Sequence, residues 1–213
     1  MKKMKNLLAL MLAFVMLFTT TATALASETS QNANPVVVVT EQGISINNVY
    51  YSQAEFTELL DTAVEVPQTK SAAAIVAGTW YIPGVGQVVV TVAGAIVVGG
   101  AVVAVGSWVY NLIADWFQTR AFNSSAEKVV NGCNENKQNH IMNSKHNWNK
   151  FKKDPKWSDV APILIKTLKD GEETWEKNDQ YIRTLIYKGE TVVVRFLKDA
   201  EGLVKNIGTA WTE

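Results

Sequence analysis

The sequence predicts an α+β protein built from successive segments, and three observations support this prediction. In the last third of the chain, segments with apolar residues at three- and four-residue spacing come before segments rich in β-branched residues. The middle of the chain is an uncharged hydrophobic run, and the N-terminus has the pattern of an export signal. We therefore expect a signal peptide, a small ββα module, a Gly/Val-rich hydrophobic segment and a C-terminal domain. In that domain, two helices precede an antiparallel sheet of three to four strands.

Residues 1–26 are predicted to be a secretory signal peptide. Three lysines come before an apolar stretch over residues 7–18, and Ala24-Leu25-Ala26 forms a cleavage site. The alternative is an uncleaved membrane anchor, but the apolar stretch is short. We therefore expect a protein that is secreted, or associated with the cell surface or membrane, after cleavage.

Residues 27–70 are predicted to be a small module that precedes the hydrophobic segment and the C-terminal domain. Strands are expected at 36–40 and 44–51, and Ser52 and Glu55 have the spacing of a helix capping box. The module has no catalytic constellation, so it is interpreted as a packing or docking element.

Residues 71–117 are predicted to be a hydrophobic, membrane-associated segment. No charged residue lies between Lys70 and Asp115, and a helix over residues 87–114 would be long enough to cross about 30 Å of hydrocarbon. The alternative is a buried hairpin within a soluble fold, because Val and Gly are poor helix formers in water. Two further features favour membrane contact: the small-residue pairs Ala95/Gly99 and Gly100/Ala104, and the aromatic residues Trp108, Tyr110 and Trp116.

Residues 118–132 are predicted to form a linker helix, and residues 133–213 the C-terminal domain. Apolar residues share one helical face over 136–151, and a second helix is expected over 157–168 with Pro162 in its first turn. The strands are expected at 181–187, 191–197 and 203–211, with turns at 188–189 and 199–202.

Charge and cysteine content limit the possible chemistry. Residues 128–213 hold fifteen basic and twelve acidic residues, a net charge of +3, which suits a polyanionic substrate. Cys133 is the chain's single cysteine, so an internal disulfide is excluded, and it could be catalytic only as a lone thiolate near His140. No metal-ligand motif is present, and we expect neither a metal nor another cofactor.

Both histidines of the chain lie in one short stretch, at positions 140 and 146. Histidine can take up and release a proton near neutral pH, so acid–base chemistry in this chain would depend on these two residues. In a continuous helix they would be about 600° apart around the axis and would point to different sides. They converge only if part of the segment is a loop.

The remaining reactive residues are typical of metal-free phosphodiester cleavage. In that reaction a base removes the ribose 2′-hydroxyl proton, a cation stabilises the phosphorane and an acid protonates the leaving oxygen. Each candidate also has an alternative role without catalysis. For each histidine it is a surface or capping role, for the lysine it is solvent exposure, and for the arginine and the threonine it is an ordinary strand position. The candidate catalytic residues are His140, His146, Lys145, Arg195 and Thr209.

Short motifs in this domain resemble a known family. They are His-Ile-x4-His-x-Trp from His140, then Lys-Gly-x-Thr-Val-x-Val, and a closing Gly-Thr-Ala-Trp. This order resembles the C-terminal domains of bacterial polymorphic toxins, and in particular type 35, within the ribonuclease group of barnase, EndoU and RelE. The resemblance implies an α+β ribonuclease with catalytic positions at the five candidates above. Because no second arginine lies near Arg195, substrate binding is expected from Lys150, Lys152, Lys153 and Trp148.

The resulting hypothesis is a secreted antibacterial toxin with a metal-independent endoribonuclease domain. Its expected partners are an RNA substrate, a cognate immunity protein and a membrane contacted through residues 71–117, without sequence-specific recognition of DNA. One alternative is a membrane-permeabilising, bacteriocin-like toxin that acts through residues 71–114. Another is a membrane-tethered surface protein that binds a partner and has no catalytic activity.

Overall fold

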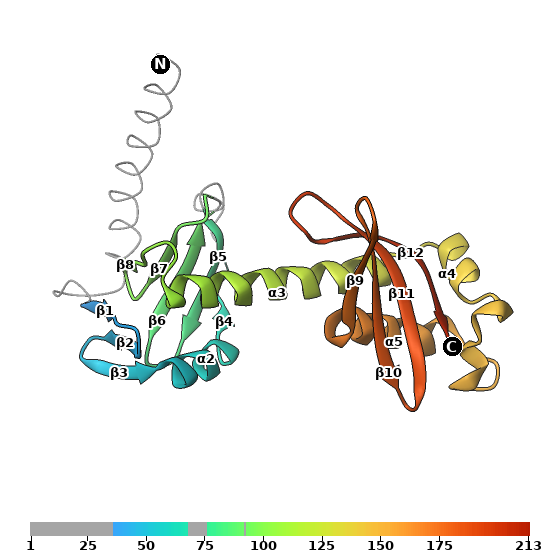
Figure 1. Ribbon diagram of the computed structural model, residues 1–213, viewed down its shortest axis with the longest axis horizontal. Helices are drawn as coiled ribbons and strands as arrows, with labels where there is room; N and C mark the ends of the chain where they lie inside the picture. The colour runs from blue at the N-terminus through green and yellow to red at the C-terminus, as the bar shows by residue number, and fades with distance from the viewer. Residues whose placement is uncertain (1–35, 68–75, 92) are drawn as a thin grey trace, which may run out of the picture. The chain divides into compact units, whose positions relative to one another are not determined.

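The computed structural model describes residues 36–67, 76–91 and 93–213, and within them it shows helices and three antiparallel sheets (Figure 1). The predicted α+β class is confirmed. The predicted signal peptide, residues 1–26, lies outside the described residues. The chain forms two compact units, divided in sequence between Trp116 and Phe117, and each is described by itself.

The first unit begins with a three-stranded antiparallel sheet followed by a short helix. A single strand was predicted over 44–51, but the chain turns at Asn47 and Asn48, which have φ angles of 51° and 67°. Positive φ at both central residues is typical of a tight type I′ hairpin turn. The predicted capping box at the start of the helix is confirmed. These elements are β1 (Val37–Val39), β2 (Gly43–Ile46), β3 (Val49–Ser52) and α2 (Gln53–Asp61).

The described part of the hydrophobic run forms strands up to Val102 and becomes helical only from Trp108, so the expectation of one helix over 87–114 is wrong. Gly99 and Gly100 lie in the turn between two short strands, and Ala95 and Ala104 lie just outside those strands, so the pairs Ala95/Gly99 and Gly100/Ala104 have no helical face to share. Within the described ranges, no helix is both long enough and apolar enough to cross a membrane. The strands are β4 (Val64–Glu65), β5 (Val76–Ile82), β6 (Gly86–Thr91), β7 (Ile96–Val98) and β8 (Ala101–Val102), paired in chain order.

The aromatic residues at the end of the hydrophobic run hold the first unit together. They lie in the first turns of α3 (Trp108–Asn131), which begins earlier than the linker helix predicted from Gln118. The indole of Trp108 donates a hydrogen bond to the carbonyl of Thr40, with an N–O distance of 2.6 Å. The Tyr110 hydroxyl donates to the carbonyl of Gly94 at 3.1 Å. Both residues therefore tie α3 to loops of this unit.

The second unit is a four-stranded antiparallel sheet covered by helices on one face (Figure 1). The three predicted strands are found within about two residues of their predicted ends, and the charged segment 172–177 adds a fourth at the sheet edge. Helix α5 (Trp157–Asp170) packs on the two central strands, β10 and β11. The strand order is β12-β11-β10-β9, for β9 (Glu172–Lys177), β10 (Gln180–Tyr187), β11 (Glu190–Lys198) and β12 (Val204–Thr212).

The core of the second unit lies between the sheet and its helices. Val192, Val194 and Phe196, at alternate positions of β11, all point into it. The segment predicted as a linker helix also contributes, because Phe122 and Val130 of α3 are part of the same core. Pro162 is in the second turn of α5 rather than the first as predicted.

Candidate functional site

The stretch that contains both histidines is not a continuous helix. Helix α4 (Glu135–Ile141) ends just after His140, and two short 3₁₀ turns follow, η1 (Ser144–His146) and η2 (Trp148–Lys150). Asn147 between the two turns has a left-handed backbone with φ of 59°, a conformation that asparagine adopts more readily than most residues. The helical face expected over 136–151 is therefore broken. Part of the segment is a loop, which is the condition under which the two histidines were expected to converge.

The two imidazole rings pack edge to face, with ring centroids 5.6 Å apart. His140 is exposed, whereas His146 is buried behind it with 7% of its surface accessible. Nδ1 of His146 lies 2.8 Å from the carbonyl oxygen of Ile141. Since a carbonyl only accepts hydrogen bonds, Nδ1 carries the proton and Nε2 is left for proton exchange.

The same carbonyl of Ile141 also holds Trp148, whose indole N–H donates to it at 2.8 Å. Trp148 is 2% exposed and belongs to the core of the second unit. An enclosed indole offers no face on which a nucleic-acid base could stack. Trp148, predicted as a substrate-binding residue, is therefore placed as a packing residue that supports the histidine loop.

Thr212 fastens the histidine loop to the edge strand β12. Its hydroxyl donates to the carbonyl of Asn147 at 2.9 Å, and the Asn147 side-chain amide donates to the carbonyl of Thr212 at 3.3 Å. Helix α4 and both 3₁₀ turns contact β12 (Figure 1). The positions of both histidines are thus set by contacts to residues more than sixty positions away in the sequence.

The surroundings of the histidine pair are basic. The pKa of His140 lies below its ordinary value because the ring is partly desolvated and because His146, Lys137 and Lys145 repel a proton on it. In the part of the chain that the structure describes, no carboxylate forms an ion pair with any of these four residues. The arrangement favours a neutral His140 at neutral pH and an anionic ligand beside it.

Lys137 was not among the predicted site residues. It lies one helical turn before His140, and its Nζ donates to the carbonyl of Gly208 in β12 at 3.2 Å. The i,i+3 spacing on one helix face could have identified it, once α4 was assigned as a helix.

Arg195 and Thr209 are brought together, but separately from the histidines. They are directly opposed residues of β11 and β12, on the face of the sheet opposite Val194 and the core. Arg195 forms an ion pair with Glu176 at 2.7 Å. Within the described residues, no hydrogen bond, ion pair or ring contact connects this pair to either histidine.

Two of the three predicted substrate-binding lysines already have acidic partners. Lys150 pairs with Glu190 at 2.7 Å and Lys152 with Asp159 at 2.8 Å, and both lysines are exposed. Exposed ion pairs contribute little stability, so a phosphate could compete for either lysine. Lys153 is exposed as well.

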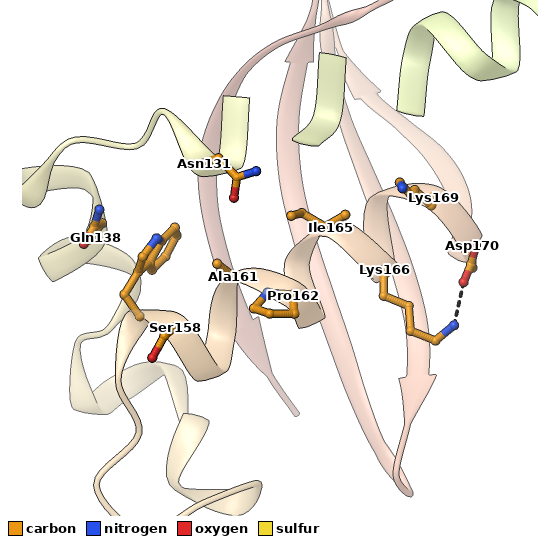
Figure 2. Close-up of a pocket in the computed structure, with 10 residues that line it drawn as sticks. Asn131, Gln138, Ser158, Ala161, Pro162, Ile165, Lys166, Lys169 and Asp170 are labelled. Atoms are coloured by element: carbon orange, nitrogen blue, oxygen red, sulfur yellow. Dashed lines mark hydrogen bonds and ion pairs between the residues drawn. The ribbon is translucent and has the colours of Figure 1, made fainter. Parts of the chain in front are cut away.

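An open groove lies elsewhere on the second unit, between the end of α3 and α5 (Figure 2). Its charged rim is internally paired, since Lys166 bonds Asp170 and Lys169 bonds Glu127 outside the view. None of the predicted site residues lines it. The groove brings no general base or nucleophile together with a free cation, so the histidine pair is the better candidate site.

Comparisons with family models, with curated proteins and with solved structures give no match for this chain. The resemblance to polymorphic toxins therefore remains a prediction from the motifs. Among the described residues, no group of three or more His, Cys, Asp or Glu side chains could hold a metal ion.

Proposed function

We propose that the second unit is a metal-independent endoribonuclease that uses His140 and His146 as its acid–base pair. The observation that carries this proposal is the contact between the two rings, at 5.6 Å, within a cluster of cations that form no ion pair with a carboxylate of the described residues. Two histidines that differ in exposure can have different roles, one as base and one as acid.

His140 is proposed as the general base, because its lowered pKa keeps it neutral and its ring is exposed to substrate. It takes the proton of the ribose 2′-hydroxyl while the 2′-oxygen forms a bond to phosphorus. The bond from phosphorus to the 5′-oxygen then breaks, and His146, protonated on both ring nitrogens for this step, donates its Nε2 proton to that oxygen while Nδ1 keeps its proton toward the Ile141 carbonyl. The products are a 2′,3′-cyclic phosphate and a free 5′-hydroxyl, and Lys145 is available to stabilise the phosphorane charge.

The test is RNA cleavage in EDTA by the chain without residues 1–26, followed by detection of cyclic phosphate ends. His140→Ala is expected to slow cleavage about 10²–10⁴-fold, as for loss of a general base. His146→Asn keeps a donor for the Ile141 carbonyl but has no titratable group, so we expect a comparable loss in a folded protein. Lys177→Gln, in an exposed strand at the far sheet edge, is the matched control and should cleave normally. A folded wild-type chain that leaves RNA intact would refute the proposal.

In its biological setting, the chain is proposed to be an exported antibacterial toxin held in check by an immunity protein. The signal-peptide pattern over residues 1–26 and the motif resemblance in the second unit support this role. Expression inside the cytoplasm should arrest growth and fragment RNA in the wild type. Neither effect should appear with His140→Ala.

A second candidate function is membrane permeabilisation through residues 71–114, with membrane contact through 71–117. One observation favours it: Val102 and Val105, in the uncharged run, are 59% and 80% exposed. Exposed apolar side chains without nearby charge suit a lipid surface. Dye release from anionic liposomes by the chain, lost in Val105→Asp, would support this function. An absence of release would count against it.

A further inference from the structure

A β-bulge interrupts the edge strand β12 beside the histidine loop. Arg195 is opposite Thr209 and the next residue, Phe196, is opposite Ile207, so Gly208 between them has no partner in β11. Bulges of this kind redirect side chains and occur frequently next to functional sites.

Two cationic side chains converge on the bulge at Gly208. Lys137 reaches it from α4, with its Nζ 3.2 Å from the Gly208 carbonyl oxygen. Arg195 reaches it from β11: a Cβ built on Gly208 would lie 3.6 Å from Cγ and 3.8 Å from Cδ of that arginine. The arginine stem therefore lies within van der Waals distance of position 208. Lys137 is three residues before His140 in the sequence, and Arg195 lies on β11, the strand that pairs with β12.

Two buried polar atoms next to the bulge have no hydrogen-bond partner. They are Nε of Arg195 and Oγ1 of Thr209, on directly opposed residues. Buried polar groups are nearly always satisfied, so a neighbouring pair left without partners calls for an explanation. Both atoms can donate a hydrogen bond, and an oxyanion would accept from both.

Among the described residues, Arg195 forms an ion pair with one carboxylate, that of Glu176. Its Oε1 pairs with Arg195 and its Oε2 accepts from Gln180. Lys137 forms no ion pair with any described residue. An anion that takes the guanidinium from Glu176 would gain both the arginine and the lysine.

We propose that Lys137, Arg195 and Thr209 form an anion cradle around the Gly208 bulge, which holds a phosphate group of the nucleic-acid substrate at the strand edge that Lys137 contacts, one helical turn before His140. This proposal rests on the proposed ribonuclease function for the identity of the substrate, but not for the binding of phosphate itself. It adds Lys137 to the site and gives Arg195 and Thr209 a role in binding.

The experiment measures binding of inorganic phosphate to the chain without residues 1–26, by calorimetry and by NMR of the two histidine rings. Lys137→Met is expected to weaken phosphate binding about 10-fold or more, because a charge-assisted hydrogen bond is lost. Lys137→Arg should restore most of the affinity. Removal of the Lys137 charge should also raise the pKa of His140.

Two further variants keep the proposal testable if Lys137→Met does not fold. Thr209→Val removes a hydroxyl without a partner in the fold, so it should leave folding intact and weaken phosphate binding a few-fold. Glu176→Gln removes the competing carboxylate and should tighten binding. Unchanged affinity in Thr209→Val and Glu176→Gln, or no phosphate binding at millimolar concentration, would overturn the cradle.

The outcome also separates the two proposals. If phosphate binds in a manner that depends on Lys137 while RNA stays intact, the cradle stands and the ribonuclease proposal fails. If RNA is cleaved and Lys137→Met changes neither KM nor phosphate affinity, the ribonuclease proposal stands and the cradle fails.

Discussion

The histidine loop and the strand pair beside the bulge differ in how completely their polar groups are satisfied. In the loop, the imidazole of His146, the indole of Trp148 and the hydroxyl of Thr212 all donate to backbone carbonyls. Three residues before Thr212 on the same strand, the Thr209 hydroxyl has no partner, and neither has Nε of Arg195. A fully bonded loop is suited to hold a catalytic ring in one orientation, whereas unsatisfied donors are suited to receive a ligand. The difference suggests that the histidine loop positions the catalytic rings and that the strand pair beside the bulge binds a ligand.

The largest effect is expected from Trp148→Ala. The indole is 2% exposed within the core, and its loss leaves a cavity, so we expect the free energy of unfolding to fall by about 3–5 kcal/mol. Chemical denaturation measures this change. An unchanged midpoint would mean that the indole lies at the surface, where it was predicted to bind substrate, and would break the contrast between the two regions.

Thr212→Val should have an intermediate effect on stability. The substitution keeps the shape of the side chain and removes the hydrogen bond to the Asn147 carbonyl, so we expect a loss of about 1–3 kcal/mol. Because this bond fastens the histidine loop to β12, the NMR signals of His146 should also broaden. If stability and the His146 signals both stay unchanged, Thr212 does not hold the loop.

Thr209→Val is the matched substitution in the same strand. Its hydroxyl is buried without a partner, so an apolar side chain of the same shape should leave stability unchanged or raise it by about 1 kcal/mol. Thermal melts of the two valine variants, recorded side by side without phosphate, give the comparison. A loss equal to that of Thr212→Val would show that the Thr209 hydroxyl is satisfied within the fold.

The smallest effect is expected from pH. Because the pKa of His140 is lower in the folded chain than in the unfolded chain, the unfolded state binds its proton first as pH falls. Stability from this group is therefore complete above about pH 6.5, the ordinary value for histidine, and is lost as pH falls toward the lower folded pKa. His140→Gln should flatten the stability curve in that interval. If the variant follows the wild-type curve, neither desolvation nor the surrounding cations lower the pKa of His140 in the folded chain.

The sequence alone determined those elements whose signals are local. The capping box at Ser52, the turn at Lys188-Gly189 and the strands on either side of it depend on neighbouring residues, and the structure contains all of them. Local patterns were insufficient where a helix and a set of strands would bury the same residues. The Val/Gly run could be a helix or a set of strands, and segment 172–177 is too charged to be identified as a strand without β10 beside it.

Only the tertiary structure decided the geometry of the candidate site. The sequence placed both histidines in one stretch, but their convergence depends on the end of α4 at Ile141 and on the turn at Ser144–His146, which Asn147 and Thr212, far along the chain, fasten to β12. In the same way, Lys137 and Arg195 meet at Gly208 because a bulge shifts the register of β12. Residue types that suit a reaction can be recognised in a sequence, because the residue type fixes the chemistry of the side chain. Their distances cannot, because packing between distant segments sets them.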